Sequence, residues 1–143
     1  MNIYFDMDGT IADLYGVDNW LEDLLHENTR PYAEATPLVN LQALARVLNR
    51  LTRSGHTINI ISWTSRNGSE EYNEAVRQVK LKWLAKHLKS VTFTTINIVP
   101  YGTPKSLFNV DCGILFDDEE RNREEWTGEA YDETEIFEIL KWL

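Results

Sequence analysis

The sequence contains one cysteine, Cys112, among its 143 residues. An intramolecular disulfide framework, of the kind that staples small secreted domains, is therefore excluded. The three histidines, His26, His56 and His87, do not have the close spacing of zinc ligands, so a zinc site is not expected either. We expect Cys112 to be a small buried residue before a strand, not a nucleophile, and the protein to work in the cytoplasm.

Basic residues and long apolar runs are also scarce. The chain has 14 lysines and arginines against 23 acidic residues, which gives a formal net charge of −9. Binding to a nucleic-acid backbone depends on clustered positive charge, so nucleic acid is disfavoured as a partner. No stretch comes near the ~18 consecutive apolar residues of a membrane-spanning helix, and the residues after Met1 do not resemble a signal peptide. No membrane association is expected.

Apolar residues are abundant enough for one sizeable core. They make up 43 % of the chain, which argues against disorder and for a single domain over residues 1–143. Apolar strand-like segments alternate with segments whose apolar residues recur at helical spacing. This alternation predicts an α/β fold, a Rossmann-like three-layer α/β/α sandwich with a central parallel sheet. Strands are expected at 2–6, 57–62, 91–99 and 113–116, and helices around 20–25, from about 37 to 54, from 69 to about 88 and over 134–143.

The most informative motif, Asp6-Met7-Asp8-Gly9-Thr10, lies at the end of the first predicted strand. Residues i and i+2 of a strand point the same way, so Asp6 and Asp8 aim at one spot. Gly9 permits the sharp turn that follows, and Thr10 brings a hydroxyl to the same place. Two carboxylates aimed together repel unless a cation binds them, and Mg²⁺ prefers oxygen ligands. The same residues are also ordinary turn chemistry after a strand, so the motif alone leaves both interpretations open.

Polar residues occur at the ends of two other predicted strands. Ser62 and Trp63 end the second strand, Asp117 and Asp118 end the fourth, and Lys105 begins the segment before the fourth. In a parallel sheet, ligands bind outside the carboxyl ends of the strands. Taken singly, Ser62 could be a turn hydroxyl, the acidic pair could begin a helix, and Lys105 could be a solvated lysine. Their joint occurrence in this order favours one shared site.

This set of motifs resembles that of the haloacid dehalogenase (HAD) superfamily of phosphohydrolases and spans residues 2–118. The matching features are Asp-x-Asp-Gly-Thr at 6–10, Ser62 after an apolar strand, Lys105 before the fourth strand and the acidic pair at 117–118. Within the superfamily, the chain is most similar to small bacterial and phage proteins grouped with 5′(3′)-deoxyribonucleotidases. The resemblance implies an enzyme, a phosphatase of the HAD type.

The resemblance also implies a role for each of these residues. Asp6 is the implied nucleophile, which forms an aspartyl-phosphate, and Asp8 is the implied general acid and base. Ser62 and the backbone of Trp63 would bind the phosphoryl oxygens. Lys105 would neutralise charge on the nucleophile and the phosphate during the transfer.

The implied cofactor is Mg²⁺. The resemblance implies that the Asp6 carboxylate, the Asp8 backbone carbonyl and Asp117 bind it. Asp118 either replaces one of these ligands or holds the ligands in position. Thr10 is expected to bind substrate beside this metal.

Residues 13–36 form a short cap-like insert after the first motif. It is too short for a separate lid domain, so we expect an open rim and broad, weak specificity. Its aromatic residues, Tyr15, Trp20 and Tyr32, either stack on an aromatic leaving group or bury one face of a helix. The sequence leaves these two interpretations open.

The sequence as a whole predicts a Mg²⁺-dependent phosphomonoesterase acting on nucleoside monophosphates or other small phosphate esters. The expected partner is thus a small phosphorylated substrate. Two alternatives are a phosphatase of nucleic-acid phosphate ends, which the −9 charge disfavours, and a non-catalytic HAD-like binding domain. The complete set of motifs disfavours the second alternative.

Overall fold

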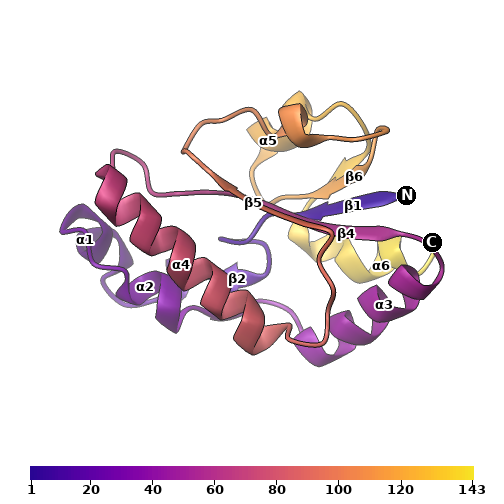
Figure 1. The fold of residues 1–143 in the computed structure, drawn as a ribbon, viewed down its shortest axis with the longest axis horizontal. Helices are drawn as coiled ribbons and strands as arrows, with labels where there is room; N and C mark the ends of the chain where they lie inside the picture. Colours follow the sequence, from indigo (N-terminus) through magenta and orange to yellow (C-terminus); the bar gives the residue numbers. More distant parts are fainter.

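The computed structural model describes residues 1–143 and contains a five-stranded sheet with helices on both faces (Figure 1). The strand order is β5-β4-β1-β6-β7, and all neighbouring strands are parallel. This arrangement confirms the predicted three-layer α/β/α sandwich. The strands are β1 Asn2–Phe5, β4 Thr57–Trp63, β5 Thr95–Val99, β6 Ile114–Phe116 and β7 Ala130–Tyr131. The helices are α1 Trp20–Leu25, α2 Arg30–Glu34, α3 Leu41–Arg53, α4 Glu70–His87, α5 Glu120–Glu125 and α6 Ile136–Leu140.

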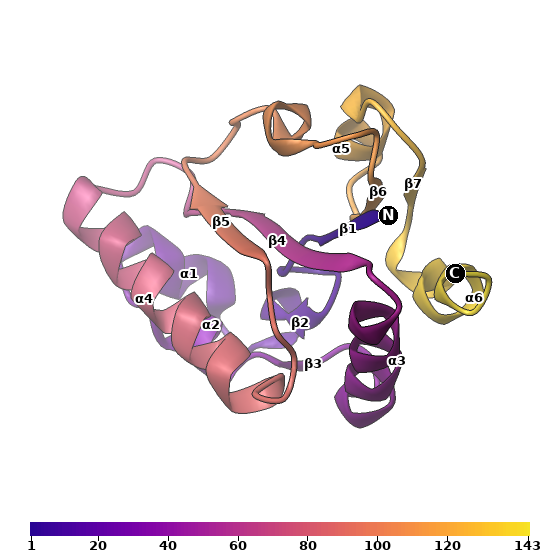
Figure 2. The same cartoon turned by 45° about the vertical axis from the view of Figure 1, so that its right-hand side comes forward.

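The central strand β1 is buried on both faces. Ile3 and Phe5 belong to the larger core, to which α3, the C-terminal half of α4 and α6 contribute. Tyr4 belongs to a smaller core on the other face, where it packs edge to face against Trp126, with ring centroids 5.2 Å apart. Figure 2 shows α3 and α6 on one side of the sheet and α5 on the other. Burial on both faces explains why the strand is apolar from Ile3 to Phe5.

One helix begins later than its sequence pattern predicts. The pattern places a helix start at Pro37, but Thr36–Pro37 form β3, which pairs antiparallel with β2 (Ala12–Asp13). Helix α3 begins four residues further on, because Asn40 caps it. The Asn40 side-chain oxygen accepts a hydrogen bond from the Ala43 N–H at 3.0 Å. The strand predicted over 91–99 likewise begins only where its pairing with β4 begins.

Cys112 is exposed, whereas its position before a strand predicts burial. Asp111 and Cys112 both have positive φ angles, 52° and 51°. These two residues form a tight turn at the surface, immediately before the chain enters β6. The turn therefore leaves the thiol outside the core that begins at Ile114.

The longest helix, α4, has 18 residues. Ser69 caps its start as the sequence predicts, because the Ser69 hydroxyl accepts a hydrogen bond from the Tyr72 N–H at 3.1 Å. No helix of the protein, α4 included, has the combination of length and hydrophobicity that a bilayer-spanning segment requires.

The insert over residues 13–36 packs against the N-terminal half of α4 (Figure 1). At its base, Asp13 of β2 lies opposite Thr36 of β3. Between these strands the chain forms the 3-10 helix η1 (Leu14–Gly16), α1 and α2. A buried cluster joins the insert to α4; its members are Leu14, Tyr32, Tyr72 and Val76. The insert is thus held beside the carboxyl end of β1, from which it departs.

Candidate functional site

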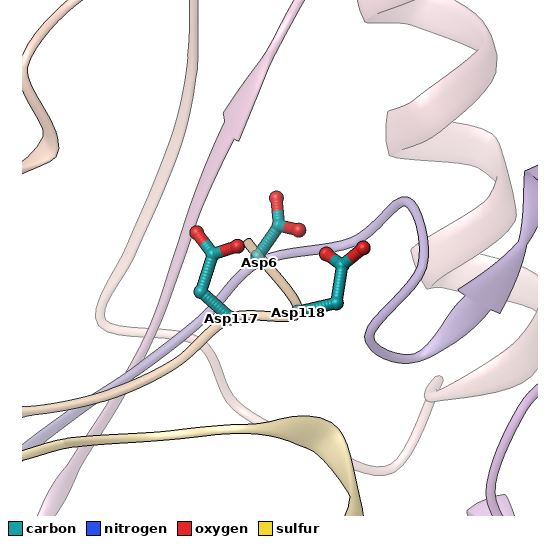
Figure 3. Close-up of side chains that lie close together, drawn as sticks. All are labelled: Asp6, Asp117 and Asp118. Atoms are coloured by element: carbon teal, nitrogen blue, oxygen red, sulfur yellow. The ribbon is translucent and has the colours of Figure 1, made fainter. Parts of the chain in front are cut away.

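The carboxyl ends of β1 and β6 bring three predicted residues together. Asp6 comes directly after β1, and Asp117 and Asp118 come directly after β6. One carboxylate oxygen from each lies within 4.8 Å of the others. Figure 3 shows the three side chains pointing to the same side from the strand ends. Because β1 lies between β4 and β6, this edge of the sheet is a topological switch point, where α/β sheets bind ligands.

Lys105 bridges two of these carboxylates. It lies in the 3-10 helix η2 (Lys105–Phe108), and its Nζ donates to Asp6 Oδ1 at 2.9 Å and to Asp117 Oδ2 at 2.6 Å. Burial alone lowers the pKa of a lysine, but the two carboxylates raise the pKa of Lys105 above its ordinary value, so it stays charged. Only 4 % of the residue is exposed, which excludes the interpretation as a solvated lysine.

Thr10 and Gly9 shape the turn after β1. Thr10 is fully buried, and its hydroxyl lies 3.2 Å from Asp6 Oδ2 and 3.3 Å from Asp118 Oδ1. Thr10 has no exposed surface, and its hydroxyl orders two carboxylates in the structure. That Thr10 also contacts substrate stays a prediction. Gly9 has a φ angle of +82°, and a Cβ there would lie 2.3 Å from Asp118 Oδ2. This turn therefore requires glycine, as the motif predicts.

Asp8 does not join the carboxylate cluster through its side chain. Its Oδ2 accepts a hydrogen bond from Lys80 Nζ at 2.7 Å, and the same ammonium donates to Ser62 Oγ at 2.9 Å and to the Trp63 carbonyl at 2.7 Å. Burial raises the pKa of Asp8, and Lys80 offsets part of this rise. Ser62 is buried behind the cavity described below, whereas Asp8 and Trp63 line it.

Lys80 and Asn122 are residues of the site that the sequence does not single out. Asn122 is buried, and its Nδ2 donates to Asp117 Oδ2 at 3.1 Å. Lys80 is the less expected of the two. It lies on α4 between Val76 and Leu84, at four-residue spacing from each, and only 1 % of it is exposed. Lysines are almost never buried to this extent unless they are paired. The sequence does offer one signal of this burial, because Lys80 falls at the helical spacing of the apolar residues Val76 and Leu84.

The carboxylates at this edge carry more charge than the two lysines neutralise. Four ionised carboxylates, those of Asp6, Asp8, Asp117 and Asp118, carry four negative charges. Lys80 and Lys105 neutralise two of them, and one Mg²⁺ would balance the remaining two. Burial first, and then the proximity of Asp6, raise the pKa of Asp117 to about 6 and the pKa of Asp118 to about 8. The Asp8 carbonyl oxygen accepts no backbone hydrogen bond. The three clustered carboxylates form an all-oxygen donor set, which fits Mg²⁺.

This cluster predicts that the metal-free protein loses stability as the pH rises. Because the folded-state pKa values of Asp117 and Asp118 are raised, the folded protein binds more protons than the unfolded protein between roughly pH 4 and pH 8. Their contribution to stability is therefore complete at low pH and is lost as the pH rises through the folded-state values. We expect the Tm of EDTA-treated protein to fall by roughly 5 °C between about pH 5 and about pH 8.5.

Scanning fluorimetry in the presence of EDTA measures this slope, and added Mg²⁺ should flatten it. Asp118→Asn should reduce the slope, whereas Asp111→Asn should not, because Asp111 is an exposed acid that controls for the change in net charge. A metal-free protein whose Tm stays constant or rises over this range would contradict the prediction.

A cavity of about 460 Å³ opens beside the carboxylates, with Asp6, Asp8 and Lys105 at its charged end. The insert supplies most of its apolar lining, which comprises Leu14, Tyr15, Trp20, Leu21, Leu24, Leu25 and Tyr32. No residue of α1 is buried, and its four apolar residues line this cavity, although Leu24 also packs against the cluster that joins the insert to α4. The short length of the insert predicts an open rim. In the structure, the insert instead forms one wall of the cavity.

The loop after β4 lines another part of the cavity. The Thr64 hydroxyl is buried there without a hydrogen-bond partner. The Trp63 ring lies 5.2 Å from Lys105 Nζ and packs against Tyr101, with centroids 4.8 Å apart. Arg66 is exposed and forms no ion pair, and its guanidinium lies 5.8 Å from the centre of the Tyr101 ring. This side of the cavity thus presents an exposed cation, Arg66, and a threonine whose hydroxyl has no partner within the protein.

Comparison with models of protein families gives no match for this sequence, and neither does comparison with curated proteins. Solved structures do share its fold. The D,D-heptose 1,7-bisphosphate phosphatase from Burkholderia thailandensis superimposes with a TM-score of 0.53 at 16 % identity, over 86 % of this chain and 69 % of that chain. The D,D-heptose 1,7-bisphosphate phosphatase from B. bronchiseptica, complexed with magnesium and phosphate, superimposes with a TM-score of 0.54 at 15 % identity. This superposition covers 90 % of this chain and 77 % of that chain.

A chain of the Pnkp1/Rnl/Hen1 complex has a TM-score of 0.54 at 20 % identity. The superposition covers 92 % of this chain and 44 % of that one, so this chain spans less than half of its length. At these levels of identity the comparisons establish the fold. The protein therefore has the α/β fold that the two heptose bisphosphate phosphatases have.

Proposed function

We propose that this protein is a Mg²⁺-dependent phosphomonoester hydrolase of the HAD superfamily that forms an aspartyl-phosphate. The observation that carries the proposal is the position of Asp6, whose carboxylate lies 2.9 Å from the buried Lys105 ammonium and beside Asp117 and Asp118. The cavity of about 460 Å³ gives a substrate access to that carboxylate. The motifs of the sequence and the fold shared with phosphatases support the same assignment.

The chemistry proceeds in two steps that use the same side chains. In the first step, an Asp6 oxygen attacks phosphorus and the bond to the leaving oxygen breaks, while Asp8 donates a proton to that oxygen. In the second step, the ionised Asp8 takes a proton from water, whose oxygen attacks phosphorus. The bond to Asp6 then breaks and inorganic phosphate leaves. Lys105 neutralises charge on Asp6 and on the phosphoryl group in both steps.

Burial of Asp8 favours the protonated acid that the first step requires, since burial raises its pKa. Mg²⁺, held by Asp6, Asp117 or Asp118 and the Asp8 carbonyl, would neutralise charge on the phosphoryl oxygens when bound. The Trp63 backbone remains the proposed contact of the phosphoryl group, and we propose that Ser62, buried behind the cavity and bonded to Lys80, supports this end of β4. We add Thr64, which lines the same cavity and whose hydroxyl has no partner within the protein.

Hydrolysis of benzyl phosphate, followed as released inorganic phosphate, tests this function. We expect steady turnover with Mg²⁺, a loss of at least ~100-fold in EDTA and recovery when Mg²⁺ is restored. Turnover of a 3′-phosphorylated oligonucleotide should be weaker, because the chain carries a net charge of −9. A pure, folded protein that hydrolyses no phosphomonoester in Mg²⁺ would instead be a binding domain.

The apolar wall of the cavity favours a leaving group with a flat apolar ring, as in nucleoside monophosphates. Tyr15 and Trp20 pack edge to face, with centroids 4.9 Å apart, and both rings line the cavity. The loop after β4 brings Arg66 and Asn67 to the same cavity, where they can meet polar atoms on the edge of a ring. A ring with an apolar face and polar edges fits both parts of this lining.

Comparison of benzyl phosphate with ethyl phosphate isolates the contribution of the ring, because the two leaving alcohols have similar basicity. We expect kcat/KM to be ~10- to 100-fold higher for the benzyl ester. Trp20→Ala should lower the benzyl value about tenfold and leave the ethyl value nearly unchanged. Trp142→Ala, which removes an exposed tryptophan at the C-terminus, is the matched control. Equal values for the two esters would refute this part of the proposal.

A further inference from the structure

Lys80 is a buried cation that the chemistry described above does not use. Its ammonium has three hydrogens, and the structure gives each an acceptor: Asp8 Oδ2 at 2.7 Å, Ser62 Oγ at 2.9 Å and the Trp63 carbonyl at 2.7 Å. No N–H remains for a substrate, and Lys80 does not line the cavity. Lys80 therefore acts on the three groups that accept its hydrogen bonds, not on the substrate.

The second lysine of the site is arranged differently. Lys105 donates to Asp6 and Asp117, which leaves one N–H without an acceptor, and it lines the cavity. Lys105 is thus placed to contact a phosphoryl group, whereas all three N–H groups of Lys80 are bonded within the protein. The two lysines have separate tasks.

We propose that Lys80 is a positioning residue that holds Asp8 in the orientation needed for proton transfer. The proposal rests on the proposed function, in which Asp8 is the general acid and base. The hydrogen bond from Lys80 goes to Asp8 Oδ2, while Asp8 Oδ1 accepts no hydrogen bond and is left to exchange a proton with the leaving oxygen. Without this bond, the Asp8 side chain would be free to turn to other rotamers.

The three acceptors come from two segments that carry different parts of the site. Asp8 lies in the turn after β1, whereas Ser62 and Trp63 lie at the end of β4, which is proposed to bind the phosphoryl group. Lys80 therefore fixes the distance between the proton donor and the phosphoryl group. A proton transfer depends on such a distance, since donor and acceptor must come within hydrogen-bond reach.

The surroundings of Lys80 hold it in place. The residue lies near the middle of α4, and the buried residues Val76 and Leu84 flank it one turn away on each side. The Tyr32 ring, from the insert, lies with its centre 5.1 Å from Lys80 Nζ. Tyr32 belongs to the buried cluster that joins the insert to α4. The insert thus supports the lysine as well as lining the cavity.

Dependence on the leaving group distinguishes a positioning role from a purely structural one. A 2,4-dinitrophenolate leaves without a proton, whereas a benzyl alkoxide needs one from Asp8. The value of kcat/KM reports the steps up to formation of the aspartyl-phosphate. Misplacement of Asp8 should therefore affect the benzyl ester far more than the dinitrophenyl ester. A general loss of folded protein would lower both values equally.

We expect Lys80→Met to lower kcat/KM for benzyl phosphate by about 100-fold and that for 2,4-dinitrophenyl phosphate by less than about fivefold. Lys82→Met, on the exposed side of the same helix, is the matched control and should change neither value. Lys80→Arg keeps the charge but displaces the donors, so the same selective loss should occur in a smaller degree. This variant provides the test where Lys80→Met does not fold.

A second measurement uses Asp8→Asn. In that background, Lys80→Met should have little further effect on the benzyl ester, because the group that it positions no longer transfers a proton. Equal losses on both esters in the Lys80 variants, or fully additive losses with Asp8→Asn, would overturn the positioning role. Wild-type protein that hydrolyses neither ester would overturn the proposed function itself, a result distinct from both.

Discussion

Asp6→Asn should lower kcat for phosphomonoester hydrolysis by at least ~10³-fold. The substitution keeps the size of the side chain but removes the attacking negative charge and weakens one oxygen ligand of the proposed cation. It also removes the ion pair with Lys105, whose ammonium lies 2.9 Å from Asp6 Oδ1. Steady-state release of inorganic phosphate from benzyl phosphate in Mg²⁺ measures the loss.

A stability measurement separates this loss from misfolding. Because the carboxylates at this edge outnumber the lysines, removal of one charge should leave the Tm of Asp6→Asn in EDTA equal to that of the wild type or higher. Asp111→Asn, at an exposed turn, is the control for activity and should keep wild-type turnover. Turnover near the wild-type rate in Asp6→Asn, in a preparation free of contaminating phosphatase, would remove Asp6 from the role of nucleophile.

Mg²⁺ should raise the Tm of the wild-type protein by roughly 5 to 10 °C at a hundredfold excess over its Kd, because it binds the folded state only. Asp117→Ala should lose most of this response and at least ~10²-fold of kcat. Asp117 is fully buried, and its carboxylate lies within 4.8 Å of those of Asp6 and Asp118, so its removal takes away a central oxygen donor.

Asp118→Ala, measured in the same series, assigns the direct ligand. If Asp118 only supports the ligands, its variant should keep most of the Mg²⁺ response that Asp117→Ala loses. Asp111→Asn again controls for the loss of charge, because asparagine tolerates the positive φ angle of 52° at this position. An identical Mg²⁺ response in Asp117→Ala and in the wild type would show that Asp117 does not hold the metal.

The sequence is most informative where local chemistry and the topology of a parallel sheet act together. The apolar runs that become β1, β4 and β6 each end in polar residues, and parallel strands bring their carboxyl ends to one edge. This is why the sequence places Asp6 and Asp117 in one site, with Lys105 in the segment before β6. The glycine in the turn after β1 follows from the same local reasoning, since its φ angle of +82° is disfavoured for other residues.

Local patterns mislead where a competing interaction is nonlocal. Pro37 has the character of a helix start, but the chain pairs there with β2, which lies about two dozen residues earlier in sequence. Around Thr10 local patterns are incomplete, because its hydroxyl contacts Asp118, which follows β6. In both cases the deciding partner is distant in sequence, so no window around the residue contains it.

By itself, therefore, the sequence determined the order of the main strands and helices, the parallel sheet and the acidic edge, because these depend on periodicity and on residues at strand ends. The sequence does not predict the short strands β2, β3 and β7 or the helices α2 and α5. Only the tertiary structure decided how the site is completed. Lys80 joins Asp8, 72 positions away in sequence, to the end of β4, and the insert turns Trp20 toward a cavity instead of a core. Both outcomes depend on how α4 and the insert pack together, and such long-range packing leaves only faint traces in local sequence patterns.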